Sequence, residues 1–401
     1  MTLNKVDLTL LAILAGTCSS AAIANSITEA LTNGKTSANL NLRYENVSQD
    51  NAKKDADALT LRTRLTYATG SIKGFSSLVE FEDSRNVFGI DDYNNTLGKK
   101  PSYSVIADPE TSELDQFFLK YQQKLLAVKA GRQVITMDNH RFVGHVGWRQ
   151  DRQTFDGLTI DYQQIKNLSL QYGYITKRNR IFAEAKDIDA KDHLINASYK
   201  TPAGKITVYS YLLEMDNGTE NGLDTYGLRF NGSSTFGMQK VSYNLEYASQ
   251  ESDSATTPYQ TDYISVEVST ALLGIGFKAG YELLGSDDGM YGFSTPLATL
   301  HKFNGWSDQF LATPKEGLAD LYASIGGKFS SGKWAVIYHK FDANEASATV
   351  DDLGSEINAV YSKNFTKNYS AGIKLASYSA GDVASAKVDT DKIWVWVTAK
   401  F

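Results

Sequence analysis

The sequence predicts an all-β protein: a single transmembrane antiparallel β-barrel of 18 strands, with 16 strands as the fallback. Three observations lead to this prediction. Apolar and polar side chains alternate along about eighteen segments, and a period of two places each segment between two different surroundings. The connections between these segments are alternately short and long. No apolar run long enough for a membrane-spanning helix follows residue 24.

Residues 1–24 are expected to be a secretory signal peptide that is removed. Lys5 supplies a weak basic start, a short apolar run follows, and Ala22-Ile23-Ala24 fits an A-x-A cleavage site. The residues before Cys18 fit a lipoprotein site poorly, so lipidation is the less favoured interpretation. Residues 25–401, which contain no cysteine, are expected to form one barrel domain without disulfides or thiolate metal sites.

The expected strands begin shortly after this signal and continue to the last residue. In chain order they span 36–48, 58–69, 73–85, 112–123, 125–133, 151–165, 167–178, 190–200, 204–214, 221–231, 236–249, 257–269, 271–285, 317–330, 332–343, 351–363, 366–378 and 387–401. Their outward faces are rich in Leu, Val, Ile, Tyr and Phe. The first strand, for example, carries Ala38, Leu40, Leu42 and Tyr44 on one face.

The connections favour a barrel over a sandwich. The long ones are 48–57, 86–111, 134–150, 178–190, 215–220, 250–256, 286–316, 343–351 and 379–387, and a short turn separates each from the next. An up-and-down outer-membrane barrel has this pattern because its periplasmic turns are short and its extracellular loops are long. Hydrocarbon cannot satisfy an open sheet edge, so such a sheet must close.

The C-terminal strand ends the chain on an aromatic residue, Phe401. This arrangement resembles the C-terminal signal of bacterial outer-membrane barrels, which the barrel-assembly machinery reads. The resemblance implies that Phe401 is an assembly signal, that the protein lies in the outer membrane, and that its partners are outer-membrane lipid and that machinery. The alternative is an edge strand of a soluble sandwich.

The inward faces are predicted to line a pore of mixed charge. The candidate pore-lining and selectivity residues are Arg43, Arg62, Arg64, Glu80, Glu82, Lys120, Lys129 and Arg229. Lys374 and several carboxylates lie on the same face further along the chain. Rows of Arg and Lys bias a pore toward anions. In the alternative interpretation, Glu80 and Glu82 are salt-bridge partners that stiffen the wall.

Loop 134–150 and the residues just after it are predicted to narrow the pore. The candidate constriction residues are Asp138, His140, Arg141, Trp148, Arg149 and Arg152. Phe142 and Trp148 could stack on sugar rings, but we favour a role in pinning the loop to the wall. Trp394 and Trp396 face inward, where we favour packing against the N-terminal stub at 25–36 over sugar binding.

The same stretch resembles the alginate-export-like branch of the substrate-selective, eighteen-stranded outer-membrane channels. The shared features are Gly131-Arg132-Gln133, the step from Arg141 to Gly144, Trp148-Arg149-Gln150, and Thr154-Phe155-Asp156-Gly157. The resemblance implies a loop folded into the channel, with arginines lining a path for an anionic or carbohydrate-like solute.

The expected function is therefore passive diffusion of small hydrophilic solutes. The alternative is a structural, receptor or adhesive barrel without an open pore. No catalytic, cofactor-binding or metal-binding motif is found: His140 and His145 have no standard metal spacing, and no phosphate loop or nucleophile elbow is present. The net charge of −6 and the absence of a basic block argue against nucleic acid.

Overall fold

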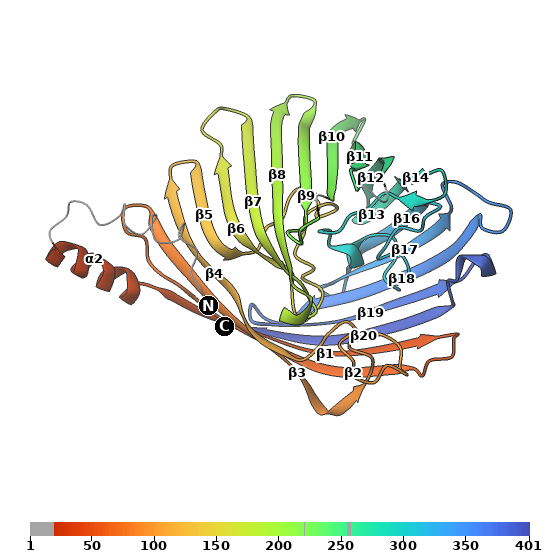
Figure 1. Ribbon diagram of the computed structural model, residues 1–401, viewed down its shortest axis with the longest axis horizontal. Coiled ribbons are helices and arrows are strands. Elements are labelled where there is room, and N and C mark those ends of the chain that lie inside the picture. The colour runs from red at the N-terminus through yellow and green to blue at the C-terminus, as the bar shows by residue number, and fades with distance from the viewer. Residues whose placement is uncertain (1–19, 220, 255–257) are drawn as a thin grey trace.

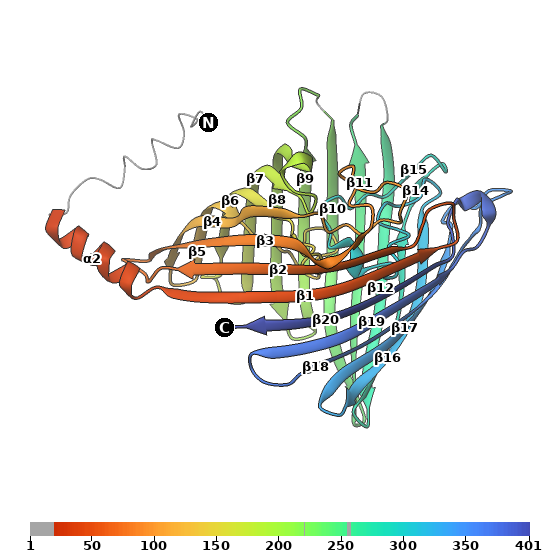
Figure 2. The same cartoon turned by 90° about the horizontal axis from the view of Figure 1, so that it is seen from below.

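The computed structural model describes residues 20–219, 221–254 and 258–401. Its main feature is one closed antiparallel barrel of 18 strands (Figure 1). The barrel is closed because β1 (Lys35–Gln49) pairs with β2 (Ala56–Ala68) on one side and with β20 (Thr390–Lys400) on the other (Figure 2). The predicted fold class and strand number are confirmed.

Each predicted strand has one counterpart in the barrel. The others are β3 (Phe75–Asp92), β4 (Thr111–Gln123), β5 (Leu126–Gln133), β6 (Thr154–Tyr162), β7 (Leu168–Asn179), β8 (Ile188–Thr201), β9 (Gly204–Glu214), β10 (Gly222–Phe236), β11 (Gln239–Ser252), β12 (Tyr259–Leu272), β13 (Ile275–Leu284), β16 (Leu318–Phe329), β17 (Gly332–Asp342), β18 (Asp352–Asn364) and β19 (Tyr369–Ser379). Most boundaries differ from the prediction by a few residues. The largest difference is in β3, which continues to Asp92 rather than ending at 85.

The predicted alternation of short and long connections is confirmed from β3 onward, whereas the two connections that flank β2, 50–55 and 69–74, have the same length. Two of the tightest turns, at 237–238 and 273–274, contain Gly237 with φ 61° and Gly274 with φ 81°. Glycine occupies this left-handed region without steric cost, which suits tight hairpins. The opposite ends of the strands carry the long loops. Loop 285–317 contains the small hairpin β14 (Ser286–Asp287) and β15 (Tyr291–Gly292), which the sequence pattern did not predict.

The two faces of the wall differ as the alternation predicted. Outward side chains such as Leu65, Phe81, Val266 and Leu321 are 40–58% exposed. An apolar outward band is what a lipid-facing barrel requires. The lumen contains a second apolar region that was not predicted. There, loop residues Ile135, Met137 and Phe293 are buried against inward-facing wall side chains.

The described N-terminal segment is the helix α2 (Ser20–Thr32), which projects away from the barrel (Figures 1 and 2). It contacts the turn between β2 and β3, where the Gly70 N–H donates to the Ala30 carbonyl at 2.8 Å. The signal peptide stays a prediction, and most of it lies outside the described residues. Within the described ranges, no helix is long and apolar enough to cross a bilayer.

Candidate functional site

Loop 134–153 lies inside the barrel, as predicted for a constriction loop (Figure 1). Its Asp138 carboxylate accepts a hydrogen bond from Asn196 at 2.7 Å and pairs with Lys205 at 3.2 Å. Lys205 is the second residue of β9, close to a short turn. The loop therefore reaches deep into the lumen. His140 packs edge-on against His145, with ring centroids 5.4 Å apart.

Arg141 is the most enclosed of the predicted constriction residues, with 2% of its surface exposed. Its Nε donates to Glu282 Oε1 of β13 at 2.8 Å, and a terminal nitrogen donates to Asn304 of loop 285–317 at 3.1 Å. The guanidinium also lies over the Phe303 ring, 4.8 Å from its centroid. Arg141 thus joins both pore loops to the wall.

The two aromatic residues of the loop are pinned, as the favoured interpretation held. Phe142 packs against Tyr209, Tyr263 and Phe293, with ring centroids 5.2 to 6.0 Å apart. Trp148 contacts the edges of Trp394 and Trp396 at 5.8 and 5.5 Å.

The partner predicted for Trp394 and Trp396 was therefore wrong: they pack against loop 134–153, not the N-terminal stub. The stub cannot reach them because α2 lies outside the barrel (Figure 2).

Arg149 and Arg43 form a junction at which three loops meet the wall. Arg149 pairs with Glu45 of β1 at 3.0 Å and with Asp308 of loop 285–317 at 3.0 Å. Arg43 of β1 pairs with Asp108 of loop 93–110 and donates to the Trp148 carbonyl. Both arginines are buried, so this junction closes that side of the lumen.

Arg64 and Arg152 form a second buried network on β2, β3 and β4. Arg64 pairs with Glu82, and Arg152 pairs with Glu80 and with Asp115, the latter at 2.7 Å. The salt-bridge interpretation of Glu80 and Glu82 therefore describes their geometry. The partner of Glu80 comes from the loop rather than from the wall.

The remaining predicted pore residues contact the wall rather than the loops. Arg62 donates to Asn39 at 2.8 Å, and Arg229 donates to Asn244 at 2.7 Å. Lys120 and Lys129 are half-buried in the lumen, and the Lys129 ammonium lies 5.3 Å from the Phe118 ring centroid. None of the four joins either loop network.

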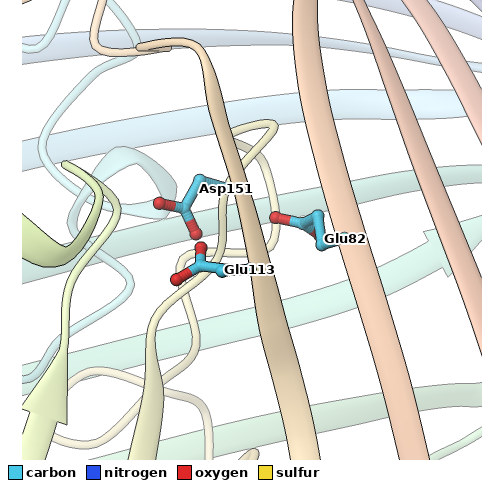
Figure 3. Close-up of side chains that lie close together, drawn as sticks. All are labelled: Glu82, Glu113 and Asp151. Carbon is cyan, nitrogen blue, oxygen red and sulfur yellow. The ribbon is translucent and has the colours of Figure 1, made fainter.

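Three carboxylates that the sequence did not associate come together beside Arg64. Those of Glu82, Glu113 and Asp151 lie within 4.8 Å of one another (Figure 3). Burial, followed by the charges of Glu113 and Glu82, raises the pKa of Asp151 well above its usual value. The raised pKa favours the protonated form of Asp151, which can donate to a neighbouring carboxylate, so we assign the cluster no ligand.

A cavity of about 560 Å³ lies on the side of Arg141 that faces the long loops. It is lined at the loop ends of β7 to β12 and by loop 285–317. Its charged lining residues within the described ranges are Arg141, Arg178 and Arg180, with no carboxylate among them. Arg178 is paired with Asp192 at 2.6 Å. Arg180 forms no ion pair with any described residue and lies over the Phe182 ring. We call this space the outer cavity.

A second cavity, of about 240 Å³, lies toward the short turns and is called the inner cavity. Its lining contains the basic side chains of Arg229, Lys278 and Lys302 and the carboxylates of Glu267, Glu282 and Asp320. Lys278 pairs with Glu267 at 2.8 Å, whereas Lys302 donates to the Asn139 carbonyl and forms no ion pair in the described chain. Burial, followed by the nearby charges of Lys278 and Arg229, lowers the pKa of Lys302.

Arg180 and Lys302 were missed at the sequence level. The run Lys177-Arg178-Asn179-Arg180, at the loop end of a strand, was a usable signal for Arg180. Lys302 lies in a long loop with no periodicity, so only the fold could place it in the lumen. Asp108 and Asp308, which hold the arginine junction, were missed for the same reason.

The closed barrel and its loop-narrowed, charged lumen define the class of protein as an outer-membrane channel of the porin type. The chain belongs to the alginate export family, whose sequence model matches residues 35–286. The expected class and outer-membrane location are confirmed. No curated protein sequence matches the chain.

Solved structures share the fold. OccK9 (OpdG) of Pseudomonas aeruginosa is 14% identical, with 93% of this chain and 99% of that chain covered and a TM-score of 0.73. OccAB4 of Acinetobacter baumannii is 13% identical, with 92% and 98% covered and a TM-score of 0.74. OpdK of Pseudomonas aeruginosa, solved with vanillate, is 13% identical, with 92% and 98% covered and a TM-score of 0.70.

Proposed function

We propose that this channel passes small hydrophilic anions, with organic acids and acidic sugars as the solute class. The observation that carries the proposal is the placement of Arg180 and Lys302. One lies in the outer cavity and the other in the inner cavity, and neither forms an ion pair with a described carboxylate. A cation in a confined, low-dielectric space raises the local concentration of anions even when the whole chain is net negative.

The route runs from the outer cavity to the inner cavity past Arg141. Because Arg141 lines the outer cavity while its partner Glu282 lines the inner one, their ion pair stands between the two. A solute carboxylate can leave Arg180, pass the buried guanidinium and reach Lys302. The structure of OpdK with vanillate, an aromatic carboxylate, supports a solute of this size and charge in a channel of the same fold.

The selectivity residues predicted on the first strands are not the main solute-attracting groups in this proposal. Arg43 and Arg64 are neutralised by Asp108 and Glu82, so they shape the constriction more than they attract solute. Arg62, Lys120 and Lys129 can add to the positive potential of the lumen.

The proposal is tested by reversal potentials in planar bilayers. We expect wild-type anion preference at 0.1 M salt and a shift toward cations in Arg180→Gln. The shift should fade at high salt, because the Debye length falls from about 10 Å at 0.1 M to about 3 Å at 1 M. Arg85→Gln is the matched control, since Arg85 pairs with Asp83 on β3 and lines neither cavity. Cation preference of the wild type in dilute salt would refute the proposal.

A further inference from the structure

Lys374 of β19 is a buried cation without a carboxylate partner. It faces the lumen, is 6% exposed, and forms no ion pair with any residue that the structure describes. A buried ammonium is costly unless other groups replace its hydration. The groups that do so here come from three separate parts of the chain.

Three indole rings surround the Lys374 ammonium. Its Nζ lies 3.9 Å from the ring centroid of Trp306, 4.1 Å from that of Trp148 and 5.3 Å from that of Trp394. Trp306 belongs to loop 285–317, Trp148 to loop 134–153 and Trp394 to β20. The face of an indole is the best aromatic partner for a cation, and the attraction grows when water is excluded.

A hydrogen bond from Lys374 Nζ to His301 Nε2, at 2.7 Å, completes the cage. His301 also belongs to loop 285–317, and its Nδ1 lies 2.6 Å from Asp308 Oδ1. A carboxylate at Nδ1 keeps the proton on that nitrogen, which leaves Nε2 free to accept from the ammonium. The His301 ring stacks on Trp148 with centroids 5.2 Å apart, so the two loops touch each other at the cation.

We infer that Lys374 is the positioning residue of the constriction: its ammonium holds loops 134–153 and 285–317 together against β19 and β20. Each loop supplies only part of the cage, and the cation is the element common to both. Arg141 and Arg149 are anchors that lie within the loops themselves, and the wall residues Arg43 and Glu356 each hold one of these two loops. Lys374 reaches both loops from the wall, and it therefore sets where they rest in the lumen.

The test uses Lys374→Met, which keeps an unbranched side chain and removes the charge. In single-channel recordings we expect this variant to spend about tenfold more time in a higher-conductance state, as for the loss of one desolvated cation–aromatic interaction. Lys374→Arg should restore most of the wild-type behaviour. Lys363→Met is the matched control, since Lys363 of β18 lies 5.9 Å from the Phe365 ring but belongs to neither loop contact.

Tryptophan fluorescence provides a second readout that does not depend on conduction. The cage contains three of the five tryptophans in the chain, so its loss should increase quenching by acrylamide. Trp306→Phe changes the cage from the loop side and alters no residue of a barrel strand. Its effect should not add to that of Lys374→Met, because coupled residues are non-additive.

If Lys374→Met assembles with heat-modifiable mobility but has wild-type conductance states and quenching, the inference is overturned. If it fails to assemble, an unchanged Trp306→Phe channel overturns it instead. A wild-type barrel that conducts no current would count against the proposed function alone, since quenching still tests the cage.

Discussion

At the scale of single residues, charge pairing decides which side chains can meet a solute. Arg43 of β1 is paired with the loop carboxylate of Asp108 and Arg64 of β2 with Glu82 of β3, whereas Arg180 and Lys302 form no ion pair with any described residue. The alternation of a strand shows which side chains face inward. It does not show which loop residues will fold back to neutralise them.

Arg141→Met tests the barrier between the two cavities. Removing one partner of a buried pair costs about 3–5 kcal/mol, because the other charge is left uncompensated. We therefore expect a looser constriction, higher conductance and a shift toward cations at the bare Glu282 carboxylate. Planar-bilayer recordings measure both effects. The double variant Arg141→Met/Glu282→Gln should lose the cation shift, and persistence of the shift would place its source elsewhere.

Acidification should loosen the loops. Burial, followed by the charges of His140 and Arg152, lowers the pKa of His145 from 6.5 to about 4. Above pH 6.5 the His145 imidazole is neutral whether loop 134–153 is packed against the wall or detached from it. As the pH falls toward 4, His145 takes up a proton in the detached loop but stays neutral in the packed loop. The free energy that favours the packed loop therefore decreases.

The open-state current fluctuations of the wild-type channel should therefore increase between pH 6.5 and 4, and they should increase less in His145→Gln. Burial also lowers the pKa of His301, to about 3, so His301 contributes in the same direction from pH 6.5 downward, and His145→Gln removes only the part that is due to His145. Equal responses of the two channels above pH 4 would show that His145 is not the responsible group.

At the scale of elements, the seam between β1 and β20 joins the two ends of the chain. The Phe401 N–H donates to the Ala38 carbonyl at 2.9 Å, and the Ala38 N–H donates to the Phe401 carbonyl at 3.0 Å. The Phe401 side chain is 61% exposed and lies near Tyr369 on the outward face. The last residue thus has a backbone role in closure and a side chain free to be recognised.

Two variants separate these roles. Phe401→Ala keeps the seam hydrogen bonds and removes the ring, whereas deletion of Phe401 removes both. If Phe401 is an assembly signal, both variants should lower outer-membrane levels severalfold with secretion intact, while Phe401→Trp stays close to wild type. Quantitative blots of outer-membrane fractions measure this. Normal levels of Phe401→Ala with reduced levels of the deletion would assign the effect to the seam.

At the scale of the whole molecule, the barrel separates lipid from an aqueous, loop-filled interior. Neighbouring residues on one strand therefore respond oppositely to the same change. Val266, in the middle of β12, faces outward, while Ser265 faces the lumen opposite Glu246 and Glu282.

Val266→Arg should reduce the free energy of folding into lipid by about 2–4 kcal/mol, as for a charged side chain on the lipid face near the midplane. Ser265→Arg should change it little, because two carboxylates are within reach. Urea-dependent folding into lipid vesicles, followed by heat-modifiable mobility, measures both. Similar losses in the two variants would contradict the assigned faces.

The sequence by itself determined the barrel, its strand number, its alternating faces and its long and short connections. These follow from a period of two and from the demand that every backbone group in lipid be paired, and both are local or general constraints. It also indicated a loop that folds into the lumen, because charged and aromatic residues gather in 134–150.

Only the tertiary structure decided which charged side chains of the lumen have an ion-pair partner and which have none among the described residues. Asp108, Asp308 and Lys302 lie in loops without periodicity, and their partners are distant in sequence. The Lys374 cage likewise joins β19, β20 and two loops. Such contacts depend on how loops fold back across a closed wall, and the pattern within a single strand carries no information about that.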